Sequence, residues 1–544
     1  MKKRNFIYMC FILPSFIGIM AFYIVPFLLS LYFAVIDNMM NKEWVGLKNF
    51  KLLFENELFL SALRNTGIFC GIAIPLGMAI ALLLVLVLKK QRRGRILLIL
   101  LLIPLIVPSG TVIAFWKYLF ERNGFLDGFL QLFGKNMFDI ENSRWAILII
   151  ILMYLWKNIS FSIVLFWSGI NWIPQIYHEQ CQLDGATGRQ EFQYITWILL
   201  KPTTLVVLLM SIVNSFKVFK EIYMLYGAYP SPYVYMLQHY MNNQFLSLNM
   251  QKLSAAAWCM FLILGIFLGI IYRVQRKNLD YLSRSFVGDF MKKRYSNFFE
   301  KLICMGAVIL AVIPLLFVAG KSVQVPEEYL ILLFKRPLYL RMMWNSLIIT
   351  IPVLIGQLLL APLAAYGFWQ CRWKYKEILF YLYMIVMLMP LQLTLVPNYL
   401  VANWLGIQNS SLAIILPAMF QPLGVFLIRQ QIQDFPQETL EAARLDGASE
   451  YRIYRSIVKP NLSSAIAAAL ILIFIDNWNI VDQAVIFLRE PYQQPLSVYL
   501  CQILEEQPDI FYAASVFYAV PVLLIFLMGQ DYLIQGISMS GVKA

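Results

Sequence analysis

The chain has 544 residues, of which 60% are hydrophobic and 14% charged, and its formal net charge is +14. Soluble domains are about 45–50% apolar and about 25% charged, so this composition excludes an ordinary soluble protein and indicates an integral membrane protein. The two histidines and seven scattered cysteines show neither metal-site nor disulfide-framework spacing, so we expect no metal site.

Long apolar runs recur along the whole chain. A helix needs about 20 such residues to cross a membrane, and we predict six spans in each half. They lie near residues 6–35, 66–88, 96–116, 145–170, 203–226, 256–272, 302–319, 346–368, 378–400, 411–428, 461–488 and 511–534. The first run is too long for the core of a cleaved signal peptide and is therefore predicted to be retained. The predicted fold class is all-α integral membrane, with about twelve transmembrane helices.

Basic residues gather in three connections between the predicted spans, at 89–95, 273–294 and 372–376. All three fall on one side of the membrane if the N-terminus is cytoplasmic, as the positive-inside rule requires. The excess charge is therefore topological, with membrane lipid as the surrounding partner, and no nucleic-acid partner is expected. Both chain ends are predicted to be cytoplasmic.

The span near 145–170 contains Tyr154, Lys157, Asn158 and Phe161. Tyr154, Asn158 and Phe161 follow helical spacing and share one face. Two interpretations of Lys157 remain open. Its stem lies in the membrane while its amine reaches the interface, or the residue marks a translocation path.

Two later spans also contain polar residues. In the span near 203–226, Ser211 and Ser215 lie one helical turn apart and either join helices by hydrogen bonds or line the same path. The span near 461–488 contains the consecutive residues Asp476, Asn477, Trp478 and Asn479. Such a cluster is too polar to face lipid and must face protein or a cavity, so Trp478 and Asn479 are candidate path residues.

One polar sequence interrupts the apolar runs twice. The first copy is Glu179-Gln180-Cys181-Gln182-Leu183-Asp184-Gly185-Ala186, and 262 positions later the chain reads Glu441-Ala442-Ala443-Arg444-Leu445-Asp446-Gly447-Ala448. Each copy is predicted to form a short helix, a glycine turn and a second short helix. The basic stretch 273–301 between the copies is the predicted linker, which divides the chain into domains 1–272 and 302–544.

A Lys-Pro pair follows each copy and is expected to end its loop, because proline interrupts helices. The pairs are Lys201-Pro202 and Lys459-Pro460, which place the proline 17 residues after Gly185 in the first copy and 13 residues after Gly447 in the second. The first loop is therefore expected to be longer by four residues, or about one helical turn.

The two copies, together with Trp344-Asn345-Ser346 and the later Trp478-Asn479, resemble the membrane subunits of bacterial ATP-binding-cassette (ABC) importers. The resemblance is to the carbohydrate-uptake permeases related to the maltose importer, with both subunits fused in one chain. It implies two six-helix type I permease domains in a bacterial cell membrane. The implied function is import of a sugar or oligosaccharide by alternating access, and the chain is expected to be a transporter subunit rather than an enzyme.

The resemblance also implies roles for individual residues. Those expected to couple the chain to an ATPase are Glu179, Asp184, Gly185, Glu441, Ala442, Ala443, Asp446 and Gly447. Those expected along the substrate path are Tyr154, Lys157, Asn158, Phe161, Ser211 and Ser215. Lys157 is an unusual choice for a neutral sugar and leaves room for an acidic one.

The implied partners are a cytoplasmic ABC ATPase dimer and an extracellular or periplasmic substrate-binding protein. The sequence has no G-x-x-x-x-G-K-[ST] motif, so no cofactor is expected in this chain and ATP with Mg²⁺ is expected on the partner ATPase.

Two other classes of membrane protein are alternatives. A proton-coupled secondary transporter can also have twelve spans in two halves, but that class does not need the repeated polar sequence. A membrane-embedded glycosyl- or acyltransferase needs a catalytic carboxylate or histidine cluster, whereas His178 and His239 are far apart in the sequence. The repeat therefore favours the importer permease.

Overall fold

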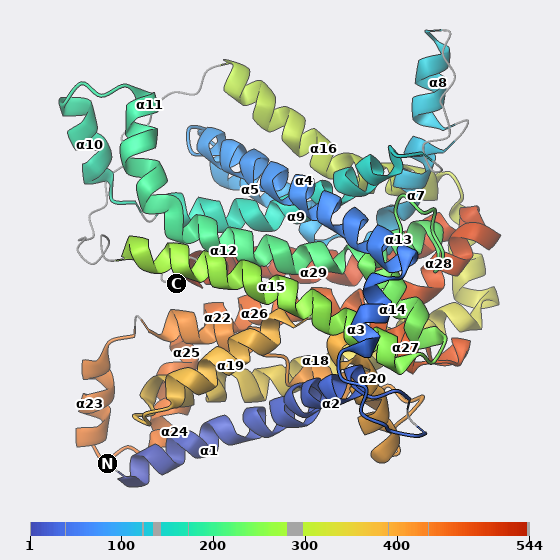
Figure 1. Ribbon diagram of the computed structural model, residues 1–544. Helices are drawn as coiled ribbons and strands as arrows, with labels where there is room; N and C mark the ends of the chain where they lie inside the picture. The colour runs from blue at the N-terminus through green and yellow to red at the C-terminus, as the bar shows by residue number, and fades with distance from the viewer. Residues whose placement is uncertain are drawn as a thin grey trace.

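The computed structural model describes residues 2–38, 40–121, 124–133, 143–171, 173–279, 298–389, 391–433 and 435–540 (Figure 1). Within these ranges the chain is helical apart from turns and one isolated β-bridge between Ile36 and Trp44. The start of the first helix and the end of the last lie at the same end of the molecule, on the left of Figure 1.

The elements of the first half run in this order: α1 (Lys2–Ile19), η1 (Met20–Ile24), α2 (Val25–Ala34), α3 (Lys48–Phe54), α4 (Glu57–Leu88), α5 (Gly94–Leu101), α6 (Ile103–Ile106), α7 (Ser109–Phe120), α8 (Phe125–Gln131), α9 (Ala146–Asn171), α10 (Gln175–Leu183), α11 (Gly188–Glu191), η2 (Phe192–Thr196), α12 (Trp197–Ser215), η3 (Phe216–Val218), α13 (Phe219–Tyr226), α14 (Leu237–Leu246) and α15 (Met250–Leu279).

The elements of the second half are α16 (Phe298–Val323), α17 (Pro326–Leu330), η4 (Ile331–Lys335), α18 (Pro337–Gln370), α19 (Lys376–Leu388), α20 (Leu391–Trp404), α21 (Leu412–Met419), α22 (Leu423–Ile432), α23 (Gln437–Leu445), α24 (Glu450–Ile453), η5 (Tyr454–Val458), α25 (Lys459–Asn461), α26 (Ser463–Trp478), α27 (Asp482–Phe487), η6 (Pro491–Gln493), α28 (Leu496–Glu506) and α29 (Pro508–Ser540).

Eight helical segments in the described ranges are long and apolar enough to cross a membrane. They are Arg4–Ala34, Glu57–Leu88, Ala146–Asn171, Gly188–Tyr226, Phe298–Val323, Pro337–Gln370, Leu412–Ile432 and Ile510–Leu533. Two bent pairs raise this number to ten if each is one span: Gly94–Ile106 with Ser109–Gln131, bent by 90°, and Glu450–Asn461 with Ser463–Trp478, bent by 74°. The predicted all-α membrane fold is confirmed at this level of eight to ten candidate spans.

The two remaining predicted spans are also helical. The run near 256–272 lies within α15 (Met250–Leu279), of which Met250–Ile266 is an apolar helix among the residues whose side chains the structure describes. The run near 378–400 is divided between α19 and α20. The run near 461–488 is also interrupted, because α26 ends at Trp478 and α27 begins at Asp482.

Each half packs its first helix against the opposite half. Helix α1 lies along α18 and α21 and α2 lies along α20, whereas α16 lies against α4, α5, α6 and α7 (Figure 1). Hydrogen bonds cross this boundary from the Tyr23 hydroxyl to the Pro417 carbonyl oxygen (3.0 Å) and from the Tyr383 hydroxyl to the Ser15 Oγ (3.2 Å). The two halves are therefore interlocked through exchanged first helices.

Candidate functional site

The two copies of the polar repeat form the same backbone element. Helix α10 leads to Gly185 (φ +71°), and α23 leads to Gly447 (φ +77°). Two residues later, Thr187 and Ser449 begin α11 and α24 by accepting hydrogen bonds from backbone N–H groups. Helices α10 and α23 project from the same end of the molecule (Figure 1). We call residues 175–196 the first loop and 437–458 the second loop.

The glycine turn has a local cause. The Ala448 N–H donates to the Ala443 carbonyl oxygen (3.1 Å) and the Gly447 N–H to the Arg444 carbonyl oxygen (3.1 Å), which is the Schellman arrangement that ends many helices. A Cβ at Gly447 would have no atom within 4 Å. Glycine is therefore favoured by the left-handed backbone alone and not by lack of space.

The loops have equal length, so the predicted extra turn is wrong. Helices α11 and α24 have four residues each, and the π-helical turns after them have five each. Pro202 lies inside α12 and does not end the first loop. A proline removes only one backbone hydrogen bond, which membrane helices tolerate, so the additional residues before Pro202 lie inside α12, which begins at Trp197.

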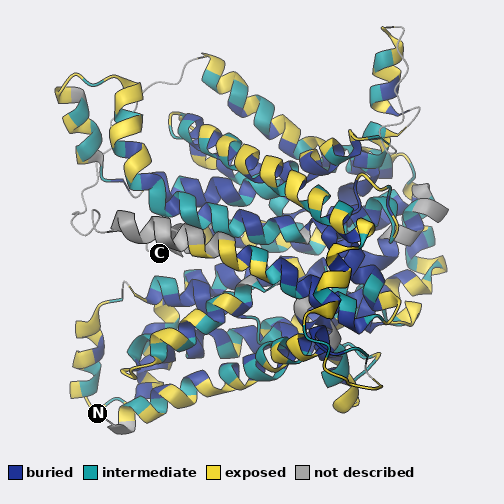
Figure 2. Ribbon diagram, viewed as in Figure 1, coloured by how far each residue is buried: buried dark blue, intermediate teal, exposed yellow. Residues whose placement is uncertain are grey.

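Both loops present an exposed surface. Figure 2 shows that α23 is exposed or intermediate along almost its whole length, and Leu440 is its only buried residue. The predicted residues Glu179, Asp184, Gly185, Glu441, Ala442, Asp446 and Gly447 are exposed, and Ala443 is intermediate. At matching positions, Leu183 is 87% exposed and Leu445 is 89% exposed. Each loop thus exposes carboxylates to solvent, together with one leucine just before the glycine turn.

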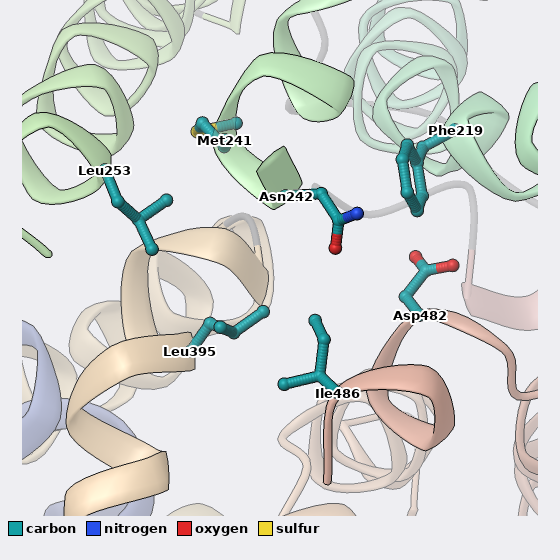
Figure 3. Close-up of a pocket in the computed structure, with 7 residues that line it drawn as sticks. All are labelled: Phe219, Met241, Asn242, Leu253, Leu395, Asp482 and Ile486. Atoms are coloured by element: carbon teal, nitrogen blue, oxygen red, sulfur yellow. The ribbon is translucent and has the colours of Figure 1, made fainter. Parts of the chain in front are cut away.

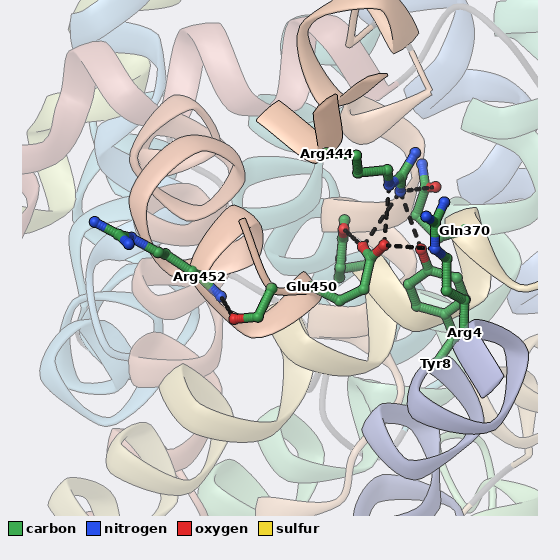
Figure 4. A network of polar contacts seen from close by, with 8 residues as sticks. Arg4, Tyr8, Gln370, Arg444, Glu450 and Arg452 are labelled. Carbon is green, nitrogen blue, oxygen red and sulfur yellow. Dashed lines mark hydrogen bonds and ion pairs between the residues drawn. The ribbon is translucent and has the colours of Figure 1, made fainter. Parts of the chain in front are cut away.

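A charged network anchors the second loop (Figure 4). The Arg444 Nε donates to the Glu450 Oε1 (2.9 Å), and an Arg444 guanidinium nitrogen donates to the Tyr8 hydroxyl and to the Gln370 Oε1, both at 3.0 Å. The Tyr366 hydroxyl donates to the Glu450 Oε2 (3.1 Å). This network joins α23 and α24 to α18 and to the exchanged helix α1.

A smaller pair holds the first loop. His178 Nδ1 lies 2.7 Å from Glu191 Oε1, and the positions 262 residues later are Leu440 and Ile453, both buried. Burial lowers the pKa of the Lys89 amine at the end of α4, and the nearby Glu191 carboxylate opposes this shift. The first loop is therefore held by polar contacts where the second has apolar packing.

Lys157 is paired inside the protein. Its Nζ lies 2.9 Å from the Glu221 Oε1, which also accepts a hydrogen bond from the Ser109 Oγ (2.7 Å), and Lys157 contacts Ser109 as well. The three residues come from α9, α13 and α7. Sequence reasoning did not single out Glu221 or Ser109. The signal that could have found Glu221 is its charge within the apolar run 203–226.

Of the other predicted path residues on α9 and α12, Tyr154 joins the two helices, whereas Asn158 and Ser215 bond within their own helices. The Tyr154 hydroxyl donates to the Ser211 carbonyl oxygen (2.9 Å), and the Asn158 Nδ2 donates to the Tyr154 carbonyl oxygen (3.1 Å). The Ser215 Oγ donates to the Ile212 carbonyl oxygen (2.7 Å). Phe161 and Asn158 are half-buried.

Trp478 and Asn479 pack against α29. The Trp478 Nε1 donates to the Tyr518 carbonyl oxygen (3.1 Å), and the Tyr518 hydroxyl donates to the Trp478 carbonyl oxygen (2.6 Å). The Asn479 Nδ2 donates to the Ile475 carbonyl oxygen (2.8 Å). Their place along a path therefore stays a prediction. Among the described residues, no group of three or more His, Cys, Asp or Glu could hold a metal ion.

Comparison with known proteins gives two matches to one family. The family described as "Binding-protein-dependent transport system inner membrane component" matches residues 73–281 and again 286–539. The chain is 30% identical over 220 residues to the arabinooligosaccharides transport system permease protein AraQ of Bacillus subtilis, covering 40% of this chain and 78% of AraQ. It is 27% identical to the probable ABC transporter permease protein YesP of B. subtilis, covering 52% of this chain and 94% of YesP.

Among solved structures, the chain is similar to a chain of a bacterial alginate ABC transporter in complex with an alginate pentasaccharide-bound periplasmic protein. The sequence identity is 21% and the TM-score 0.44, over 51% of this chain and 96% of the other.

Proposed function

Because the chain belongs to the family of binding-protein-dependent transport system inner membrane components, which matches it twice, we propose that it is both permease subunits of a sugar importer fused in one polypeptide. The chain is an ABC importer permease component for carbohydrates and a multi-pass inner-membrane protein. The finer proposal is a type I permease of twelve spans for a sugar or oligosaccharide, with domains 1–272 and 302–544 and both ends cytoplasmic. Of the proposed linker 273–301, residues 280–297 lie outside the described residues.

The observation that carries the proposal is the pair of equivalent exposed loops. A motor that closes symmetrically on two nucleotides needs two matching attachment points, and α10 and α23 project from one end of the molecule with the same turn and cap. We assign them to an ABC ATPase dimer that holds ATP and Mg²⁺. Leu183 and Leu445 would enter apolar grooves on it, while Glu179 and Glu441 would pair with basic residues.

The cargo would pass between the two halves by alternating access. An extracellular or periplasmic binding protein would deliver it to the end of the molecule opposite the loops. The names of two relatives support a carbohydrate cargo, since AraQ is named for arabinooligosaccharides and the LacG protein of Rhizobium radiobacter for lactose. Along the path, Lys157 would act with Glu221 as a neutralised pair, which weakens the case for an acidic sugar.

Variants of the second loop test the proposal. Gly447→Val places a β-branched residue in a left-handed conformation, which costs about 1–2 kcal/mol, whereas Gly447→Asn is the matched control because asparagine tolerates that conformation. We expect Gly447→Val and Glu441→Lys to remain in the membrane, to release the ATPase during purification and to lose at least nine-tenths of sugar uptake. Gly447→Asn should retain most of the bound ATPase and most of the sugar uptake.

The measurement is co-purification from detergent-solubilised native membranes, with ATP hydrolysis and uptake assayed in parallel. Normal uptake by both Gly447→Val and Glu441→Lys would falsify the docking role. An isolated chain that moves solute on a proton gradient without any ATPase would instead identify a secondary transporter.

A further inference from the structure

A small cavity lies where the two halves meet. It is lined by Phe219, Met241, Asn242, Leu253, Leu395, Asp482 and Ile486 (Figure 3). The first four residues belong to α13, α14 and α15 of the first half, and the others belong to α20 and α27 of the second. Helices α13, α14 and α27 lie at the end of the molecule opposite α10 and α23 (Figure 1). Sequence reasoning predicted none of these lining residues.

Three side chains give the cavity its chemistry. The Asn242 amide and the Asp482 carboxylate point into it, with the Phe219 ring beside them (Figure 3). Asn242 is only 6% exposed, and its Nδ2 has no hydrogen-bond partner among the described residues. A buried donor without a partner costs about 1–3 kcal/mol, so the fold retains a donor here that its own described residues do not use. We call Phe219, Asn242 and Asp482 the inter-half cluster.

His239 packs against the Phe219 ring of the cluster. Its ring centroid lies 4.7 Å from that of Phe219, and the residue is fully buried, with no hydrogen-bond partner for either ring nitrogen among the described residues. Burial lowers the pKa of His239 to about 3, so the imidazole is neutral at physiological pH. It therefore fixes the Phe219 ring without adding a positive charge.

The cavity is small in this structure. Its volume is about 10 Å³, roughly what one water molecule requires. Because its walls come from both halves, separation of the halves at this end would open it. Under the proposed alternating access, that separation is what would admit cargo, so the inference below rests on the proposed function.

We propose that the inter-half cluster is a receiving site for one neutral sugar ring when the halves separate. A sugar hydroxyl both donates and accepts hydrogen bonds, so one hydroxyl can accept from the Asn242 amide and a neighbouring one can donate to the Asp482 carboxylate. The apolar C–H face of the ring would stack on Phe219. Carboxylates accept hydrogen bonds strongly, which makes Asp482 the principal acceptor.

The charges around the cluster favour a neutral over an acidic cargo. Lys220 lies within electrostatic range of Lys157, Glu221, Asp476 and Asp482. The Lys157 charge is already balanced by Glu221, whose Oε1 lies 2.9 Å from the Lys157 Nζ. The carboxylate of an acidic sugar would meet the like charge of Asp482, which disfavours its binding.

The test uses the complete complex co-purified from native membranes and reconstituted into proteoliposomes. Sugar-stimulated ATP hydrolysis is measured against the concentrations of two neutral probes, arabinotriose and lactose, and one acidic probe, trigalacturonate. We expect the wild-type complex to respond to a neutral probe. A response to trigalacturonate alone would overturn the inference while leaving the proposed function intact. No response to any probe would overturn the sugar function and this inference with it.

Three variants separate recognition from folding. Asn242→Leu keeps the side-chain size and removes the donor, and we expect the half-saturating concentration of the neutral probe to rise about tenfold. Gln244→Leu, which also replaces an amide on α14 but lies outside the cavity lining, is the matched control and should match the wild type. Asp482→Asn should admit trigalacturonate, because it removes the repelling charge while keeping an acceptor.

Stability distinguishes a binding role from a structural one. Removing a buried amide whose Nδ2 has no partner among the described residues should leave the melting temperature of the complex unchanged or raise it. If Asn242 has a structural role, the variant complex should melt at a lower temperature. An Asn242→Leu complex with a wild-type half-saturating concentration would overturn the inference. The inference would also be overturned if the Asp482→Asn complex still failed to respond to trigalacturonate.

Discussion

The first and second loops have the same backbone conformation, but different side-chain contacts attach them to the rest of the protein. In the second loop, Arg444 and Glu450 connect to Tyr8 of the exchanged helix α1. In the first loop, the contact between His178 and Glu191 stays within the loop itself. A glycine turn and a cap are therefore enough to define the shape of such a loop. The surrounding side chains decide which helices would move with it.

The difference has a mechanical meaning. Helix α1 belongs to the first half in sequence but packs on the second, so under the proposed coupling a displacement of the second loop would reach both halves through Arg444. The first loop also lies near Lys89 at the end of α4, and the neighbouring Lys90 forms an ion pair of 2.5 Å with Glu300 of the exchanged helix α16. We infer unequal coupling, with the second loop as the stronger transmitter.

The largest expected effect comes from Arg444→Leu. The side chains of Arg444 and Glu450 are 15% and 6% exposed, so the variant leaves a buried carboxylate without its main partner, at a cost of about 3 kcal/mol. We expect a lower melting temperature of the purified chain and a large loss of uptake. The control is Arg444→Leu with Glu450→Leu, which removes both charges and should recover much of the stability. Equal melting temperatures for all three proteins would show that the network is not the anchor.

The first loop is expected to respond less to the corresponding change. His178→Leu removes one partner of a largely buried pair and should cost about 1–2 kcal/mol. Adding Glu191→Ile gives the first loop the residues found at the matching positions of the second, Leu440 and Ile453. This double variant should recover wild-type stability and ATPase coupling, measured as sugar-stimulated ATP hydrolysis. If it unfolds more readily than His178→Leu, the loops are not equivalent at this position.

Tyr8→Phe is the smallest and most selective change. It removes one hydroxyl that accepts a hydrogen bond from Arg444 at 3.0 Å, which is worth about 1 kcal/mol. We expect little change in membrane insertion but a measurable fall in the uptake obtained per ATP hydrolysed. Tyr32→Phe, which alters an exposed tyrosine of α2, is the control. If Tyr8→Phe and Tyr32→Phe give the same uptake per ATP hydrolysed, transmission through α1 is contradicted.

The features that could be predicted from the sequence are local. Asp-Gly-Ala followed by Thr187 or Ser449 specifies the turn and the next helix within a few residues, and the apolar runs specify helices by composition alone. The partner of Lys157 could not be predicted in this way, because Glu221 lies 64 residues further along the chain. A pairing of that kind depends on how α9 and α13 pack. The loop-length prediction failed because Pro202 was taken as a helix stop, although it lies within α12.

The cavity and the network were missed for the same physical reason. Asn242 and Asp482 come from opposite halves, as do Tyr8 and Arg444, and nothing in either local sequence marks the residue that meets it. Only the tertiary arrangement of the helices brings each pair together.

The exchange of first helices also constrains biogenesis. Tyr8 packs edge-on against Tyr366 with ring centroids 6.0 Å apart, yet 358 residues separate the two positions. At about 5–20 residues per second, a ribosome needs roughly 20 to 70 seconds to make the partner of the first helix. During that interval the face of α1 that packs on α18 lacks its partner. Because both halves belong to one polypeptide, each first half is made with one second half tethered to it. Helix α1 therefore does not depend on an encounter with a separate subunit.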